Sequence, residues 1–307
     1  MSRASNTARI LALTTLGAAT LGACTTADDT DHRPGLVPLA CGAAPVTYLL
    51  DDVQVPRTPQ EPAASGLDLD GDDHSENVFA QVLLVLGAFQ PGFDVSSPVR
   101  AAVADGRVAW ALSITTCGDE VRVDLAQASD ADGDGRYVLT PVDAIPAAGT
   151  LVEGRVSARD GRGAAPAATL ADGLGTFPDA GWTTADALAL EVDVTGDTLT
   201  GTLAFAFPIP DARRTLVAPI AAYFSALLQS GGSDWAAATD ANHDGVLSVD
   251  EFLAPGEYPK GVMENLFEPD VALYGPRARY GAVAGRAAAA MSVGLGIHAH
   301  VVATESL

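Results

Sequence analysis

The chain of 307 residues contains a single lysine, Lys260, and few aromatic residues, which make up 6% of it. Acidic residues outnumber basic ones by 39 to 17, so the formal net charge is −22 at pH 7. A surface this acidic repels nucleic acid and anionic lipid headgroups, and it attracts divalent cations. The composition therefore argues against a nucleic-acid-binding protein and favours a protein that attracts divalent metal cations.

Recognisable catalytic motifs are also missing. The sequence has no GxSxG elbow, no HExxH, no phosphate-binding GxxxxGK[ST] and no GxGxxG that opens a helix after a strand. His298 and His300 share one face of a predicted strand, but zinc needs a third ligand that the sequence does not indicate. We interpret this pair as a solvated strand face. Acidic pairs are too common in this chain to assign a glycosidase dyad without a fold.

Long apolar runs are absent as well, and the longest near the start covers only residues 10–21. Arg3 and Arg9 precede this run, as in a signal peptide, and the run is too short to span a bilayer. It ends in Leu-Gly-Ala-Cys at residues 21–24, which resembles the lipobox of bacterial lipoproteins. This resemblance implies a signal peptide over residues 1–23 and a lipid on Cys24. The alternative is an ordinary signal peptide that is cut nearby.

A lipoprotein of this kind would be anchored in the bacterial cell envelope, and Thr25 after the cysteine favours the outer membrane under the family's sorting rule. No later apolar run predicts a transmembrane helix, so the lipid would be the membrane attachment. Processing removes two arginines and no acid, so the charge becomes 15 minus 39, or −24. Residues 24–45, rich in Thr, Asp, Pro and Gly, predict a tether.

Only three cysteines are present, and lipid would occupy Cys24. In an oxidising envelope compartment the remaining two, Cys41 and Cys117, are expected to form one disulfide. Such a bond would join the base of the tether to a strand. The alternative is two free, buried thiols.

From residue 46 onward the pattern is mainly that of strands, with apolar alternation bounded by turn residues. The segments are VTYLLDDVQV, RVAWALSITTC, EVRVDLAQA, GTLVEGRVSA, ALALEVDVTG, DTLTGTLAFAF and, near the end, MSVGLGIHAHVVA. A hairpin is expected across Thr195-Gly196-Asp197. The sequence predicts an antiparallel sandwich or an open barrel, with a helical insertion before its last strand.

The predicted organisation is a β-rich domain at 46–215, a helical segment at 216–268 and a C-terminal strand region at 269–307 that returns to the β domain. Helices are expected at Ser75–Phe89, with Ser75 as N-cap, at Pro219–Gln229 and at Lys260–Phe267, because apolar residues recur there at helical spacing.

One motif in the helical segment is specific. A twelve-residue EF-hand loop supplies oxygens to Ca²⁺ from positions 1, 3, 5, 7, 9 and 12, with glycine at position 6. Residues 240–251 fill every one of these positions, and Gly245 stands at the sharp bend. The predicted ligands are Asp240, Asn242, Asp244, the carbonyl of Val246, Ser248 and Glu251. An acidic surface turn is the alternative.

The surroundings of this loop favour a structural ion over a sensing one. The entering helix has room only from Ser233 to Thr239, and Pro255 ends the exiting one early. Sensor EF-hands expose a methionine-rich groove, but this chain has three methionines and no second complete loop.

Two further acidic loops carry weaker signals. Residues 68–76 place Asp68, Asp70, Asp72 and Glu76 at positions 1, 3, 5 and 9, although Asp73 replaces the glycine of position 6. These carboxylates predict a second calcium site or, alternatively, stabilise the N-terminus of the helix that follows. Asp130, Asp132 and Asp134 form the first half of such a loop, which we interpret as a hairpin turn with an ion as the alternative.

The order of these features resembles a group of uncharacterised bacterial lipoproteins that contain a single EF-hand loop. The matching pieces are Asp68–Asn77, Asp240–Phe252, Leu266–Leu273 and Met291–Ile297. The resemblance implies secretion and calcium, and no reaction. We therefore expect a non-enzymatic scaffold or binding protein with structural Ca²⁺ and an unknown protein or glycan ligand. The alternatives are an envelope hydrolase with structural calcium and a calcium sensor.

Overall fold

The computed structural model describes residues 41–57, 61–69, 75–90, 92–165, 183–256, 262–271 and 290–305. The chain divides into residues 1–37 and 38–307, and every described residue belongs to the second unit. The signal peptide, Cys24 and most of the tether therefore lie outside the described residues. Within the described ranges, no helix has both the length and the apolar character needed to cross a bilayer.

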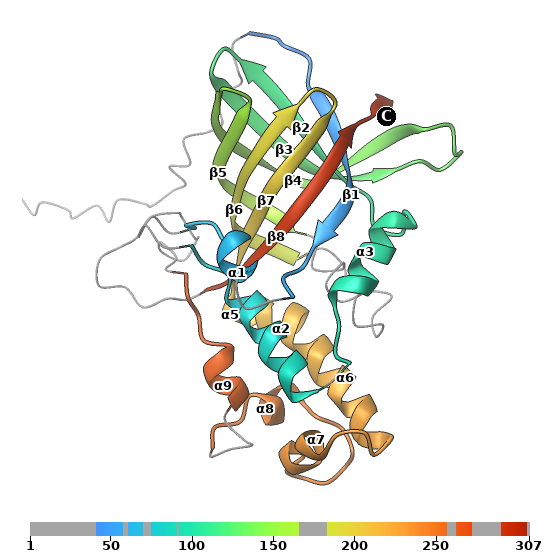
Figure 1. Ribbon diagram of the computed structural model, residues 1–307, viewed down its shortest axis with the longest axis vertical. Coiled ribbons are helices and arrows are strands. Elements are labelled where there is room, and N and C mark those ends of the chain that lie inside the picture. The colour runs from blue at the N-terminus through green and yellow to red at the C-terminus, as the bar shows by residue number, and fades with distance from the viewer. Residues whose placement is uncertain are drawn as a thin grey trace, which may run out of the picture. The chain divides into compact units, whose positions relative to one another are not determined.

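The strands of this unit form a closed antiparallel barrel of eight (Figure 1). They are β1 (Val46–Gln54), β2 (Trp110–Cys117), β3 (Glu120–Ser129), β4 (Arg136–Val152), β5 (Arg155–Ala165), β6 (Thr183–Thr195), β7 (Thr198–Pro208) and β8 (Ala290–Val301). Neighbours along the chain pair with each other, and β8 pairs with β1 to complete the ring. A short ninth strand, β9 (Ala303–Glu305), pairs in parallel with the start of β4.

The prediction of a mainly antiparallel β fold is confirmed, but the sandwich or open barrel is wrong because the ring is closed. β8 bonds β7 from Thr198↔His300 to Pro208↔Ala290, and it bonds β1 over residues 296–301. Over residues 296–300, β8 is therefore paired on both edges, which closes the ring. Alternating residues indicate strands, but they do not indicate which distant strand pairs with which.

The turns follow the glycine positions. Gly118 and Gly196 have positive φ angles of 63° and 60°, and they bring β2 to β3 and β6 to β7. The expected hairpin at 195–197 is present, with Thr195 opposite Thr198. Gly149 to Ala158 is itself a hairpin rather than one strand, because Glu153 and Gly154 adopt φ angles of 50° and 84°.

The interior of the barrel is apolar. On β6 and β7, Leu190 faces Leu203 across the ladder and both are fully buried, whereas Glu191, the next residue of β6, is half-buried. Among the side chains that the structure describes, inward ones from all eight strands belong to one hydrophobic cluster, which continues into the helices between β7 and β8. At about 25 cal/mol per Å² of buried apolar surface, this shared core is the main stabilising contribution.

The helices lie at the end of the barrel where β7 ends and β8 begins (Figure 1). They are α1 (Glu61–Ala64), α2 (Val78–Phe89), α3 (Ser96–Ala104), α5 (Ile209–Ala212), the π-helical η1 (Arg213–Val217), α6 (Ala218–Gln229), α7 (Asp234–Thr239), α8 (Val249–Phe252) and α9 (Val262–Leu266). Helix α6 matches the predicted helix closely. Helix α3 was not predicted, because its apolar face is short.

Helix α2 begins later than the sequence suggested, with Asn77 rather than Ser75 as N-cap. The Asn77 Oδ1 atom accepts the N–H of Ala80 and the N–H of Gly294, and its amide donates to the Gly294 carbonyl at 3.0 Å. The Asn77 side chain thus bonds the backbone of β8 at Gly294, beyond the last pair that β8 makes with β1. A Cβ at Gly294 would lie 2.0 Å from the Ser65 carbonyl oxygen, so glycine is required here.

Candidate metal centre

The loop of residues 240–251 joins two short helices. Helix α7 begins after Ser233, whose hydroxyl accepts the N–H of Ala236, and it ends at Thr239 with Asp240 as C-cap. Helix α8 begins after Ser248, which takes part in a capping box with Glu251. The two ends of the loop are therefore fixed by local hydrogen bonds that the sequence encodes.

The first half of the loop is folded around its own side chains. The N–H of Gly245 donates to Asp240 Oδ2 at 3.0 Å, and the N–H of Asp244 donates to Asn242 Oδ1 at 2.9 Å. The N–H of Val246 donates to Asp244 Oδ1 at 2.8 Å. Gly245 has a φ of 79°, a conformation that costs glycine little. The side chains at positions 1, 3 and 5 thus turn toward the inside of the loop.

One carboxylate oxygen of Asp240 is buried without a hydrogen-bond partner. This oxygen is Oδ1, and the residue as a whole is only 4% exposed. An unpaired oxygen of a buried carboxylate is costly, because it loses water and gains nothing in return. The other predicted ligands of the loop are carboxylate, amide, hydroxyl and carbonyl oxygens, which are the hard ligands that Ca²⁺ prefers. The carboxylates of Asp240, Asp244 and Glu251 do not all come within 4.8 Å of one another in the structure, whereas those of Asp130, Asp132 and Asp134 do. The donor types and the unpaired Oδ1 of Asp240 are therefore what fits a calcium ion here.

Glu251 closes the loop from its far end. Its Oε2 atom accepts the N–H and the hydroxyl of Ser248 at 3.1 and 2.9 Å, and its Oε1 accepts the N–H groups of Ala241 and Asn242. The backbone and side-chain hydrogen bonds from Ser248 lower the pKa of Glu251 below its ordinary value. Both oxygens of this carboxylate are thus occupied by hydrogen bonds within the loop, so a calcium ion would have to take the place of some of them.

The loop is also attached to the hydrophobic core. Leu247 and Phe252 are 3% and 1% exposed, so the middle and the exit of the loop are buried. Phe252 packs against Phe224 of α6, Trp235 of α7 and Phe267 at the end of α9, with ring centroids 6.0, 5.6 and 5.9 Å away. Fixing the loop therefore fixes the helices around this aromatic cluster.

The acidic turn between β3 and β4 also begins with an aspartate, Asp130, but both oxygens of this carboxylate have hydrogen-bond partners. The ligand atoms of Asp130, Asp132 and Asp134 come within 4.8 Å of one another. Both oxygens of Asp130 already accept N–H groups, from Gly133 at 2.8 Å and from Gly135 at 3.0 Å. The turn is half-exposed or exposed throughout and needs no ion to satisfy its carboxylates. We describe it as a hairpin turn.

The acidic loop at 68–76 is described only at its ends, and Asp70 and Asp72 lie outside the described residues. Glu76 is 8% exposed, and its Oε2 atom accepts the N–H of Leu69 at 2.7 Å. Its backbone bridges Leu67. Glu76 therefore holds the two ends of this loop together.

His298 and His300 acquire a partner that the sequence did not indicate. Their Nδ1 atoms lie 2.5 and 2.8 Å from the two oxygens of Asp51 on β1. The β1–β8 register shifts between Leu50 and Asp52, so Asp51 is the extra residue of a bulge. Partial burial raises the pKa of Asp51, but the hydrogen bonds and charges of the two histidines lower it more. The only hint of this contact in the sequence is the pair of adjacent acidic residues, Asp51 and Asp52, in the predicted first strand.

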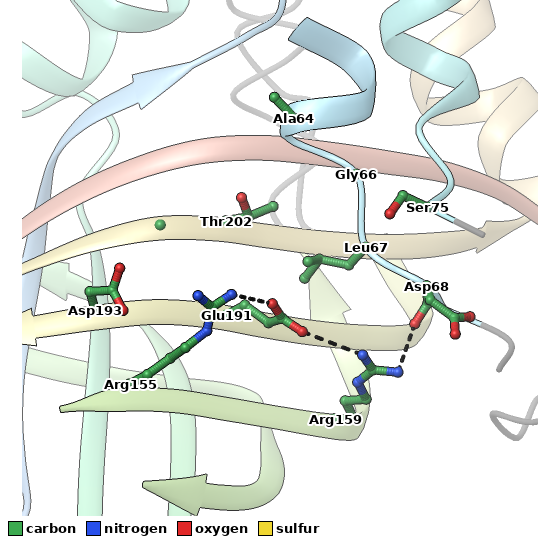
Figure 2. A pocket seen from close by; sticks show the side chains of 11 residues that line it. Ala64, Gly66, Leu67, Asp68, Ser75, Arg155, Arg159, Glu191, Asp193 and Thr202 are labelled. Carbon is green, nitrogen blue, oxygen red and sulfur yellow. Dashed lines mark hydrogen bonds and ion pairs between the residues drawn. The ribbon is translucent and has the colours of Figure 1, made fainter. Parts of the chain in front are cut away.

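A polar pocket of about 300 Å³ lies on the outer face of β5, β6 and β7 (Figure 2). Glu191 stands at its centre and binds Arg155 at 2.7 Å and Arg159 at 3.4 Å. Arg159 also donates to the Asp68 carbonyl oxygen, which ties the pocket wall to the segment after α1. Sequence reasoning did not find this network, because its members come from separate strands.

Cys41 and Cys117 lie within disulfide-bonding distance, with their Cα atoms 5.8 Å apart. This separation is in the range that native disulfides adopt. The pair connects the chain before β1 to the end of β2.

Comparisons of the chain with protein-family models, with curated proteins and with solved structures found no match.

Proposed function

We propose that this protein is a lipid-anchored calcium-binding protein of the bacterial cell envelope, in which Ca²⁺ at residues 240–251 stabilises a non-enzymatic scaffold. The buried, unpaired Oδ1 of Asp240 is the observation that carries the calcium site. The charge of −22 supports it, because such a surface concentrates divalent cations around the chain.

The arrangement of the helices supports a stabilising rather than a sensing role for the ion. Helices α7 and α8 span only Asp234–Thr239 and Val249–Phe252, too short to open a groove. Their aromatic residues are already packed in the core that continues into the barrel. Calcium would therefore stabilise the packing of these helices rather than open them, and the scaffold would present its surface to a protein or glycan partner.

The expected stabilisation follows from mass action. At an affinity of about 10⁻⁴ M, typical of extracellular calcium modules, about 10 mM Ca²⁺ stabilises by roughly 2.7 kcal/mol. At an unfolding entropy of about 2.1 cal/mol/K per residue, a gain of this size raises the Tm of a chain of this length by about 4–5 °C. Thermal melts in calcium and in excess chelator measure it directly.

The control variants separate the site from general charge effects. Asp240→Ala with Glu251→Ala should remove most of the calcium-dependent rise in Tm, and the near-isosteric pair Asp240→Asn with Glu251→Gln should do the same with less disturbance of the apo fold. Asp130→Asn with Asp134→Asn should keep the rise. A Tm that is the same in calcium and in chelator contradicts the proposal.

The lipid anchor rests on the Leu-Gly-Ala-Cys sequence at 21–24 and on the tether that follows. Replacement of Cys24 by serine should release the protein from the membrane fraction into the soluble fraction. Retention of Cys24→Ser in membranes would contradict the anchor while leaving the calcium site untouched.

A further inference from the structure

The calcium loop has a backbone requirement that its own residues do not meet. Leu247, at the eighth position, is 3% exposed and lies between the bend at Gly245 and the N-cap of α8. A buried backbone N–H needs a hydrogen-bond acceptor, and its absence costs about 1–3 kcal/mol. The sequence contains no second complete loop whose backbone could supply this acceptor.

A side chain of helix α6 supplies the missing acceptor. The N–H of Leu247 donates to Ser225 Oγ at 2.7 Å, and Ser225 is itself only 7% exposed. The single hydroxyl hydrogen of Ser225 faces the Ala221 carbonyl at 2.9 Å and the Leu247 carbonyl at 3.5 Å. The shorter contact takes the hydrogen, which leaves the oxygen lone pairs directed at the loop.

A second side chain of the same helix reaches the loop one turn later. Gln229 Nε2 donates to the carbonyl of Gly245 at 3.2 Å. Residues 225 and 229 are four apart on one helix, so both lie on the face that meets the loop. The neighbouring Phe224 packs on Phe252, which fixes the distance between this face and the loop. Helix α6 thus contacts two alternate backbone positions, as a neighbouring strand would.

We propose that α6 takes the place of a second calcium loop, and that Ser225 is the positioning residue that makes residues 240–251 a complete site within one chain. This inference rests on the calcium site proposed above. It implies one Ca²⁺ at this loop and a binding affinity that does not depend on protein concentration.

The effect of Ser225 should appear in calcium affinity more than in the stability of the calcium-free protein. Without an ion the loop would be held only by its hydrogen bonds and could shift, so that an unpaired Leu247 N–H would reach water. A bound ion would hold the carbonyl of Val246, which is joined to the Leu247 nitrogen, and would keep that N–H buried. The penalty of losing the acceptor therefore falls mainly on the bound state.

The experiment is calorimetric titration of the whole chain with calcium chloride at 25 °C, with the Asp240→Asn/Glu251→Gln variant as background. Ser225→Ala should bind about tenfold more weakly, equivalent to about 1.4 kcal/mol. Thr215→Val is the matched control. Its hydroxyl is also buried and also donates to a carbonyl four residues back, that of Asp211, but it makes no contact with the loop. This control should stay within about twofold of the wild type.

The outcomes separate the two proposals. Equal affinities for Ser225→Ala and Thr215→Val overturn the positioning role while the calcium site stands. Absence of an Asp240-dependent binding step in the wild type overturns both. If Ser225→Ala does not fold, Gln229→Leu decides, because its side chain is exposed: about threefold weaker binding supports the role of α6, and wild-type affinity overturns it.

Discussion

Reduction of the Cys41–Cys117 pair should destabilise the protein strongly without disturbing its native contacts. The two residues are separated by 76 positions, and a crosslink over a loop of this length removes unfolded-state entropy worth about 4.5 kcal/mol at 25 °C. The native state loses little, because the adjacent β1–β2 ladder, from Val46↔Ile114 to Leu49↔Ala111, holds both ends in place.

A loss of about 4.5 kcal/mol corresponds to a fall in Tm of roughly 7–8 °C for a chain of this size. Urea denaturation with and without reductant measures the free energy, and the slope m should rise on reduction because the uncrosslinked chain exposes more surface when unfolded. Cys41 is exposed, so reductant can reach it in the folded protein.

The double variant Cys41→Ser/Cys117→Ser is the control, and it should match the reduced wild type in both Tm and m. Thiol counting on the denatured, unreduced protein establishes the starting state. If the bond is present and the oxidised and reduced proteins melt at the same temperature, the entropic reasoning is refuted. If both thiols react before reduction, the alternative of two free thiols holds instead.

Three other changes test the rest of the structure. The pKa of Asp51 is lowered, which means that its contacts with the two histidines stabilise the protein at pH values above the ordinary aspartate range. The stability difference between wild type and Asp51→Asn should therefore shrink as pH falls through that range. Urea denaturation at a series of pH values measures this difference. Asp270 accepts the N–H and the hydroxyl of Ser292 on β8, and burial raises its pKa. The free energy of folding that it contributes should therefore decline as pH rises above the ordinary aspartate range, and a pH-independent stability difference between wild type and Asp270→Asn would contradict this. Gly294→Ala should lower the free energy of unfolding by about 2 kcal/mol or more, because the new Cβ would lie 2.0 Å from the Ser65 carbonyl oxygen. Gly106→Ala is the comparison: its Cβ would meet nothing within 4 Å, but its φ of +68° is unfavourable for alanine, so it should cost only about 1 kcal/mol.

The sequence predicts those parts of the fold that depend on neighbours along the chain. Alternation identified most strands, and Gly196 located one hairpin, because side-chain direction and turn conformation are local properties. Closure of the ring could not be predicted, since it depends on the pairing of residues near 50 with residues near 298. The start of α2 was misplaced for the same reason, because Asn77 is held by Gly294, 217 positions away.

The candidate site divides in the same way. Its predicted ligands lie within twelve consecutive residues, so spacing alone was enough to propose them. The unpaired oxygen of Asp240 and the acceptor provided by Ser225 are visible only after folding, because burial and the packing of α6 decide both. The partner of the two histidines, Asp51, likewise depends on a bulge that no local pattern indicates.

The position of β8 in the ring determines which surfaces a chain that lacks this strand would expose. Residues 290–301 pair with both β7 and β1, so a chain without them is an open sheet with two unpaired edges and an uncovered apolar interior. Such edges add strands from other molecules. During synthesis, association between nascent chains therefore competes with self-closure until the twelve residues of this strand become available.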